Sequence, residues 1–141
     1  MKYSCCLYPK GSETLAEAEI QMLNSYIDRA ELSDGMSILE PWVRRHSAQT
    51  PRNQMLIYTS CGWGSASLYF AEKLPNSRIT AFSNSKSQKL HMDAEAERLG
   101  LKNLQVITGD AADNEFEKEA FDRVVWIEVT PVQLIHERIA G

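Results

Sequence analysis

Hydrophobic and polar positions follow two spacings along the chain, one typical of helices and one typical of strands. Between residues 12 and 32 the apolar side chains recur at steps of three to five, which predicts an amphipathic helix that ends before Asp34. Further along, short apolar runs alternate with helical stretches. This alternation predicts an α/β fold with an open, mostly parallel sheet of about four strands and flanking helices. The predicted strands are 36–40, 78–82, 104–108 and 123–127, and the later helices are 65–74 and 85–99.

Residues 41–60 depart from this pattern. The stretch begins with three Arg, two Pro and no acidic residue among its first twelve positions, in a chain whose formal net charge is −4. It also contains another strand candidate, 54–59. Either 54–59 replaces 36–40 as the strand that precedes Cys61, or 36–40 is the strand and the stretch loops out. We therefore treat residues 1–141 as a single partial domain with an atypical insertion at 41–60.

Composition and charge exclude several classes of protein. Of the 141 residues, 43% are hydrophobic and 24% are charged, which argues against a disordered chain. The acidic balance predicts no nucleic-acid partner. The longest apolar runs span four residues and no signal-peptide core is present, so we expect no transmembrane segment and a cytoplasmic location. Three cysteines, two of them adjacent, and three widely separated histidines predict neither a disulfide framework nor a metal site.

Glycines or polar residues follow three successive predicted strands. A Gly-Trp-Gly turn at 62–64 precedes a helix, Ser-Asn at 83–84 ends the next strand with Gln88 one helical turn further on, and Asp110 follows the third. Each has an ordinary explanation in turn packing, helix capping or a loop aspartate. Ligands bind where the carboxyl ends of parallel strands meet, however, and one nucleoside-like ligand that spans all three ends explains them together.

The glycine turn does not match the fingerprint of dinucleotide-binding proteins. A G-x-G-x-x-G motif that starts at Gly62 needs glycine at position 67, where the chain has Ser67. The strand that ends in Ser83 and Asn84 also lacks the acidic residue that would hold a ribose 2′-hydroxyl. A nicotinamide-dependent oxidoreductase is therefore the weaker interpretation.

Five segments carry a more specific pattern: YSCCLY at 3–8, TLAEAE at 14–19, CGWGS at 61–65, SNSKSQ at 83–88 and FDRVVWIE at 121–128. Together they resemble class I S-adenosylmethionine-dependent methyltransferases, which have a Rossmann-like fold. Within that class the chain is most similar to the group of cyclopropane-fatty-acid synthases and coclaurine-type N-methyltransferases. The resemblance covers roughly residues 1–40 and 61–128.

The resemblance implies S-adenosyl-L-methionine as the cofactor and a set of residues around it. It places Tyr3 and Ser4 over the methionine portion, Gly62 and Gly64 at a close backbone approach, Ser83, Asn84 and Gln88 beside the ribose, and Asp110 and Ala111 beside the adenine. Glu128, which ends the last matching segment, is the candidate catalytic residue. The implied reaction is in-line attack on the sulfonium methyl group, aided mainly by positioning. The implied acceptor is a small-molecule amine or a lipid.

The first motif of the family is interrupted in this chain. The family pattern runs from a strand with an acidic end directly into the glycine turn. If 36–40 is the strand, then Glu40 is that acidic end and the insertion separates it from the turn. If 54–59 is the strand, Tyr58 takes the acidic position and Ser60 that of the first glycine.

The end of the chain departs from the family as well. After Glu128, Pro131 and Val132 occupy the positions of the family's acid/base pair, and neither transfers a proton. The chain stops at Gly141, before further strands of the family, so the edge at 124–127 is a candidate for pairing with a second chain. We expect a truncated methyltransferase that is inactive in this form. The alternative is a non-catalytic cofactor-binding or interaction fragment of the same family.

Overall fold

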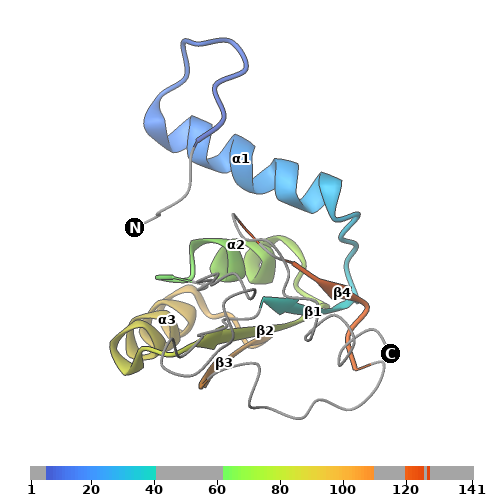
Figure 1. The fold of residues 1–141 in the computed structure, drawn as a ribbon, viewed down its shortest axis with the longest axis vertical. Coiled ribbons are helices and arrows are strands. Elements are labelled where there is room, and N and C mark those ends of the chain that lie inside the picture. The colour runs from blue at the N-terminus through green and yellow to red at the C-terminus, as the bar shows by residue number, and fades with distance from the viewer. Residues whose placement is uncertain (1–5, 41–61, 110–119, 126, 128–141) are drawn as a thin grey trace, which may run out of the picture.

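A parallel β-sheet organises the part of the chain that this computed structural model describes, residues 6–40, 62–109, 120–125 and 127 (Figure 1). In these residues the sheet has four strands in the order β3-β2-β1-β4. The strands are β1 (Ser37–Glu40), β2 (Arg78–Ser83), β3 (Leu104–Thr108) and β4 (Arg123–Val124), and the helices are α1 (Leu15–Arg29), α2 (Ser65–Lys73) and α3 (Lys86–Leu99). The open, mostly parallel α/β sheet with flanking helices is therefore confirmed.

Strand β1 lies between β2 and β4, at the middle of the sheet. Its register aligns Ile38 with Ile79 of β2 and with Arg123 of β4. The predicted strand at 36–40 is thus present and central, while the rival candidate at 54–59 and the whole insertion lie outside the described residues. Within the predicted strand 123–127, Arg123 and Val124 pair with β1, the Val125 N–H donates to the Leu39 carbonyl at 2.9 Å, and Trp126 lies outside the described residues.

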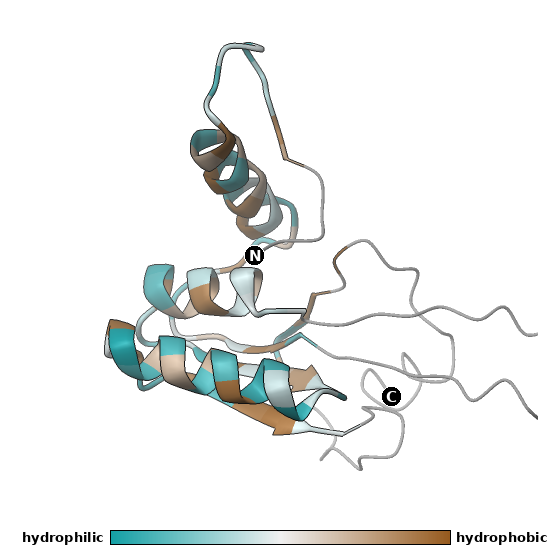
Figure 2. Ribbon diagram, turned by 90° about the vertical axis from the view of Figure 1, so that its left-hand side faces the viewer, coloured by the Kyte–Doolittle hydropathy of each residue, from teal (hydrophilic) through white to brown (hydrophobic). Residues whose placement is uncertain are grey.

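Helices α2 and α3 cover the same face of the sheet. The chain moves from β1 to β2 to β3 in one direction, and right-handed crossovers then put both connecting helices on one side. Ile38, Phe70 and Ile79 are completely buried between α2 and the sheet. Met92 of α3 fills the neighbouring space over Ala81. Figure 2 shows hydrophilic residues on the outer side of α3 and hydrophobic residues in the strand behind it.

The helices begin and end where local chemistry satisfies their terminal backbone groups. Helix α1 is shorter than the predicted 12–32 because Thr14 caps it in a reciprocal capping box with Glu17. Helix α3 follows Ser85, whose hydroxyl accepts from the Gln88 N–H at 3.4 Å, and ends at Gly100 in the left-handed conformation. No helix in the described part of the chain is long and apolar enough to cross a membrane.

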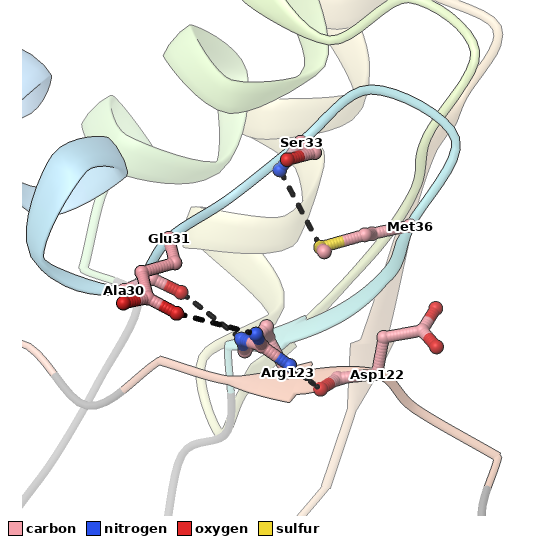
Figure 3. A network of polar contacts seen from close by, with 6 residues as sticks. All are labelled: Ala30, Glu31, Ser33, Met36, Asp122 and Arg123. Atoms are coloured by element: carbon pink, nitrogen blue, oxygen red, sulfur yellow. Dashed lines mark hydrogen bonds and ion pairs between the residues drawn. The ribbon is translucent and has the colours of Figure 1, made fainter.

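Arg123 ties the end of α1 to the sheet (Figure 3). Its Nε donates to the Ala30 carbonyl at 3.1 Å, and its guanidinium lies 3.8 Å from the Glu31 carboxylate. The neighbouring Asp122 accepts from the Ser37 N–H at 2.7 Å through its carboxylate, at the start of β1. These contacts join α1, β1 and β4 at the end of the sheet where the strands begin.

Replacing Arg123 with Ala should lower the free energy of unfolding by about 1–2 kcal/mol, because a charged donor to the carbonyl at the end of α1 is lost. Urea unfolding followed by circular dichroism measures this change. Arg98→Ala is the control, since Arg98 pairs with Glu95 on the exposed side of α3, and it should cost less than about 0.5 kcal/mol. Equal losses in the two variants would show that Arg123 does not anchor α1.

Candidate functional site

The turn at residues 62–64 leads directly into α2. Gly62 and Gly64 have φ angles of +56° and +81°, in the left-handed region that glycine adopts without strain. Gly64 is the N-cap of α2 and offers no side chain that could accept from the N–H groups of the first turn. Both glycines are buried. The sequence therefore needs glycine here for conformation, as well as for any close approach of a ligand.

Helix α3 packs directly against this turn. A Cβ atom on Gly64 would lie 2.4 Å from the Met92 Sδ, closer than real contacts allow. Beside it, the rings of Trp63 and His91 meet edge to face, with centroids 5.2 Å apart and planes at 85°. The turn is therefore held from the α3 side by two consecutive residues of that helix.

Glu40 holds the turn from the β1 side. Side chains alternate along a strand, so Glu40 points to the same face of the sheet as Ile38, toward α2. Its carboxylate accepts a hydrogen bond from the Ser67 hydroxyl, and the Ser67 backbone N–H donates to it as well. Glu40 is 5% exposed and Ser67 is completely buried. This contact bridges 27 positions of the sequence between the end of β1 and the first turn of α2.

Burial raises the pKa of the Glu40 carboxyl from its ordinary value of 4.5 to about 7, against the two Ser67 hydrogen bonds, which lower it. Loss of water disfavours the charged form more than two donors favour it. The carboxyl consequently changes its charge near neutral pH. A buried carboxyl of this kind, next to a glycine turn at the edge of a parallel sheet, is typical of a functional site.

Ser83 and Gln88 form a second polar pair at the same edge. The Ser83 hydroxyl, completely buried at the end of β2, donates to the Gln88 side-chain oxygen at 2.7 Å. The Gly109 N–H donates to the Ser83 carbonyl at 3.0 Å, so the end of β3 lies beside it. Asn84 comes next in the chain and is exposed. Of the three predicted ribose-side residues, two bond each other and the third faces outward.

The structure thus brings five predicted site residues to the carboxyl edge of the sheet. Two of them precede α2, two stand at or directly after the end of β2, and one lies in the first turn of α3. They are Gly62, Gly64, Ser83, Asn84 and Gln88. The remaining predicted site residues, Tyr3, Ser4, Asp110, Ala111 and Glu128, lie outside the described residues, as do Pro131 and Val132.

The described residues at this edge supply backbone N–H groups, the hydroxyls of Ser67 and Ser83, the carboxamides of Asn84 and Gln88, and the Glu40 carboxyl. Such donors and acceptors suit a polar organic ligand. No group of three or more metal-ligating side chains occurs within the described ranges.

The family described as "Methyltransferase domain" matches residues 58–139, more than half of the chain. The chain belongs to this family. The match begins after β1, so it includes the glycine turn and Ser67 but not Glu40. The predicted membership of the methyltransferases is therefore confirmed.

Curated relatives of this methyltransferase domain are plant N-methyltransferases. (S)-Coclaurine N-methyltransferase of Thalictrum flavum subsp. glaucum is 35% identical over 129 residues, which are 92% of this chain and 30% of the relative. N-methyltransferase 4 of Papaver somniferum is 32% identical and covers 100% of this chain and 36% of the relative. The chain spans about a third of the length of the curated relatives it matches.

Two solved structures have a fold similar to that of this chain. Coclaurine N-methyltransferase bound to N-methylheliamine and SAH superposes with a TM-score of 0.70 at 36% identity, over 87% of this chain and 31% of that one. Mycolic acid cyclopropane synthase CmaA1, complexed with SAH and CTAB, superposes with a TM-score of 0.64 at 22% identity, over 87% of this chain and 36% of that one. The second likeness establishes the fold alone.

The sequence alone did not predict the hydrogen bond between Glu40 and Ser67 or the packing of Met92 against Gly64. The available signal was weak: Ser67 stands three positions after Gly64, where a helix still has an unpaired N–H. The choice between the two candidate strands also had to be made before Glu40 could be placed at the turn.

Gly64→Ala should lower the free energy of unfolding by about 3 kcal/mol, because it adds the contact with Met92 to the strain of a left-handed residue. Gly35→Ala is the matched control. Gly35 has a φ angle of +95° and nothing lies within 4 Å of the position that a Cβ atom would take, so it should cost only about 1–2 kcal/mol. Equal costs in urea unfolding would show that Met92 moves aside freely.

The Glu40 carboxyl should make stability depend on pH. Well below pH 4.5 the carboxyl is neutral in both the folded and the unfolded chain. Between pH 4.5 and about 7 it ionises in the unfolded chain but stays neutral in the folded chain. The free energy of unfolding therefore falls as pH rises through this range. Glu40→Gln removes this titration. The stability of the variant relative to the parent should rise by on the order of 3 kcal/mol between pH 4 and pH 8. Parallel pH curves in urea unfolding would contradict the raised pKa.

Proposed function

We propose that the chain carries the S-adenosylmethionine-binding part of a small-molecule N-methyltransferase. One observation carries the proposal: in a chain of the methyltransferase family, the glycine turn, the buried Glu40 carboxyl and the Ser83–Gln88 pair lie at one carboxyl edge of a parallel sheet. This edge is where open α/β sheets bind ligands.

The residues at the edge fit an S-adenosyl compound. Gly62 has no side chain that would block close approach of a ligand to the backbone before α2, whereas Met92 fills the Cβ direction of Gly64. The exposed Asn84 and the Gln88 carboxamide are suited to hydroxyl groups such as those of a ribose. Tyr3, Ser4, Asp110 and Ala111 complete the proposed cofactor site as predictions from the sequence. Glu128 stays the proposed catalytic residue.

The reaction needs little beyond orientation and exclusion of water. When bound, S-adenosylmethionine supplies an electrophilic methyl group on a sulfonium sulfur. Gly62, Asn84 and Gln88 would hold the cofactor so that its methyl group could pass to the lone pair of an amine, and the electron pair of the broken C–S bond would stay on sulfur. The chain's own groups then act by holding the ligand rigidly against the turn, which is the main source of rate in such a transfer.

An amine is the acceptor that the relatives favour. The curated relatives at 31–35% identity are N-methyltransferases, whereas the cyclopropane synthases share only 18–22% identity with this chain. A lipid acceptor is therefore the second choice. Pro131 and Val132, at the positions of the family's acid/base pair, favour a different alternative, in which the chain binds the cofactor without turning it over.

Binding is tested first, by calorimetric titration of the chain with S-adenosylhomocysteine. We expect saturable one-to-one binding that weakens roughly tenfold in Gln88→Ala, the size of one lost hydrogen bond. Gln105→Ala is the matched control, because Gln105 is an exposed carboxamide within β3. A folded chain that does not bind would overturn the proposed function.

Turnover is tested in the same preparation with S-adenosylmethionine labelled in its methyl group. Heliamine represents the amines and an unsaturated phospholipid represents the lipids. Label in heliamine supports the N-methyltransferase, and label in the lipid assigns the acceptor to the other branch. Binding without transfer to either compound supports the non-catalytic alternative.

A further inference from the structure

The contact between Glu40 and Ser67 joins two elements that the chain order separates. Strand β1 ends at Glu40, and the described residues resume at Gly62 in the turn before α2. Even so, the Glu40 carboxylate reaches Ser67 in the first turn of α2. The glycine turn lies between these two residues in sequence, so the contact fixes where the turn stands relative to the sheet.

Glu40 replaces the side-chain cap that α2 lacks. Gly64 at the N-cap makes no side-chain hydrogen bond, although the N–H groups of a first turn need acceptors. Ser67 is the third residue of the helix, and its N–H is a usual target of a capping side chain. In this chain the acceptor for that N–H comes from β1 instead. A carboxylate also suits the positive end of the helix dipole.

We propose that Ser67 is a positioning residue: its hydroxyl holds the Glu40 carboxylate as the cap of α2, and thereby holds the glycine turn in the geometry that an S-adenosyl ligand requires. This inference rests on the proposed function. Ser67 acts through Glu40 and the turn.

Few groups around Glu40 could produce a pH dependence of binding that would be mistaken for the titration of its carboxyl. Ala81 faces it in the register of β2, and the carboxyl's pKa is set by burial and by Ser67. On the β4 side, the Val125 N–H donates to the carbonyl of Leu39 at 2.9 Å. From α3, His91 reaches the same turn through Trp63. Among the described residues, His91 is thus the titratable group to be controlled for.

The test is calorimetric titration with S-adenosylhomocysteine of the parent chain and of Ser67→Ala, Ser67→Thr and Ser25→Ala. We expect Ser67→Ala to bind roughly tenfold more weakly, because a hydrogen bond to a charged acceptor is lost. Ser67→Thr keeps the hydroxyl and should recover most of the affinity. Ser25→Ala is the control: it removes a helical serine hydroxyl that donates to the Met22 carbonyl at 2.7 Å in α1, and it should bind like the parent.

The pH profile separates positioning from simple packing. Affinity in the parent should weaken as pH falls through about 7, because the neutral carboxyl is a poorer acceptor for the α2 N–H. Ser67→Ala removes one of the hydrogen bonds that lower the Glu40 pKa, so the midpoint should move to higher pH. Glu40→Gln should flatten the profile, and His91→Gln should leave the midpoint in place. Glu40→Gln carries the test by itself if Ser67→Ala does not fold.

Two results overturn the inference while the proposed function stands. One is a folded Ser67→Ala that binds like the parent with the same midpoint, and the other is a Glu40→Gln that keeps the parent's pH profile. A Ser67→Ala that loses affinity equally at every pH, without recovery in Ser67→Thr, also overturns it in favour of packing. If the parent chain itself does not bind, the proposed function fails and this inference fails with it.

Discussion

The buried hydrogen bond between Glu40 and Ser67 is the constraint on which the arrangement of the candidate site depends. A sheet edge becomes a binding site only when the turns that follow its strands stand in a fixed place, and a turn made of two left-handed glycines has little stiffness of its own. Here the turn is held on one side by the Glu40 cap and on the other by Met92. Both contacts are buried, so water does not compete for them.

Burying the Glu40 carboxyl costs free energy of folding, and the rest of the fold must compensate for it. A carboxyl group removed from water disfavours its own charge, and the pKa of Glu40 rises accordingly. The compensating stability comes from ordinary apolar packing around Phe70 and Ile79. The apolar core therefore supplies the stability of the fold, and the contact between Glu40 and Ser67 supplies the geometry of the site. The apolar core tolerates the carboxyl, and the carboxyl orders the turn that the core alone would leave loose.

Periodicity and turn chemistry predicted most of the fold from the sequence. The strand at 104–108 has the predicted bounds, and α2 and α3 agree with their predicted bounds to within one residue. Local signals of this kind suffice because each element carries its own pattern and its own cap. At 123–127 the described residues show part of the predicted strand: Arg123 and Val124 pair with β1, and the Val125 N–H donates to the Leu39 carbonyl. Pairing depends on the neighbouring strand, which the local pattern does not contain.

The site was only partly predictable for a related reason. The glycine turn and the polar strand ends are local motifs that the sequence shows directly, and Ser83 and Gln88 bond each other at the end of β2, while the binding role of these residues stays a prediction. The inward turn of the Ser83 hydroxyl toward Gln88 could have been inferred from strand alternation, since Ser83 shares the face of Ala81. The partnership of Glu40 with Ser67 could not, because it spans 27 positions and depends on which of two strand candidates forms β1.

Because the cap of α2 comes from β1, the geometry of the glycine turn does not depend on the number of residues between Glu40 and Gly62. Closing a longer loop costs only about 0.6 kcal/mol for each doubling of its length. Extra residues between Glu40 and Gly62 are therefore a small entropic burden as long as the two buried partners still meet. The segment between Glu40 and Gly62 is consequently a suitable place to split the protein into two complementing fragments. It would also suit the insertion of a sensor domain whose conformational change displaces the turn.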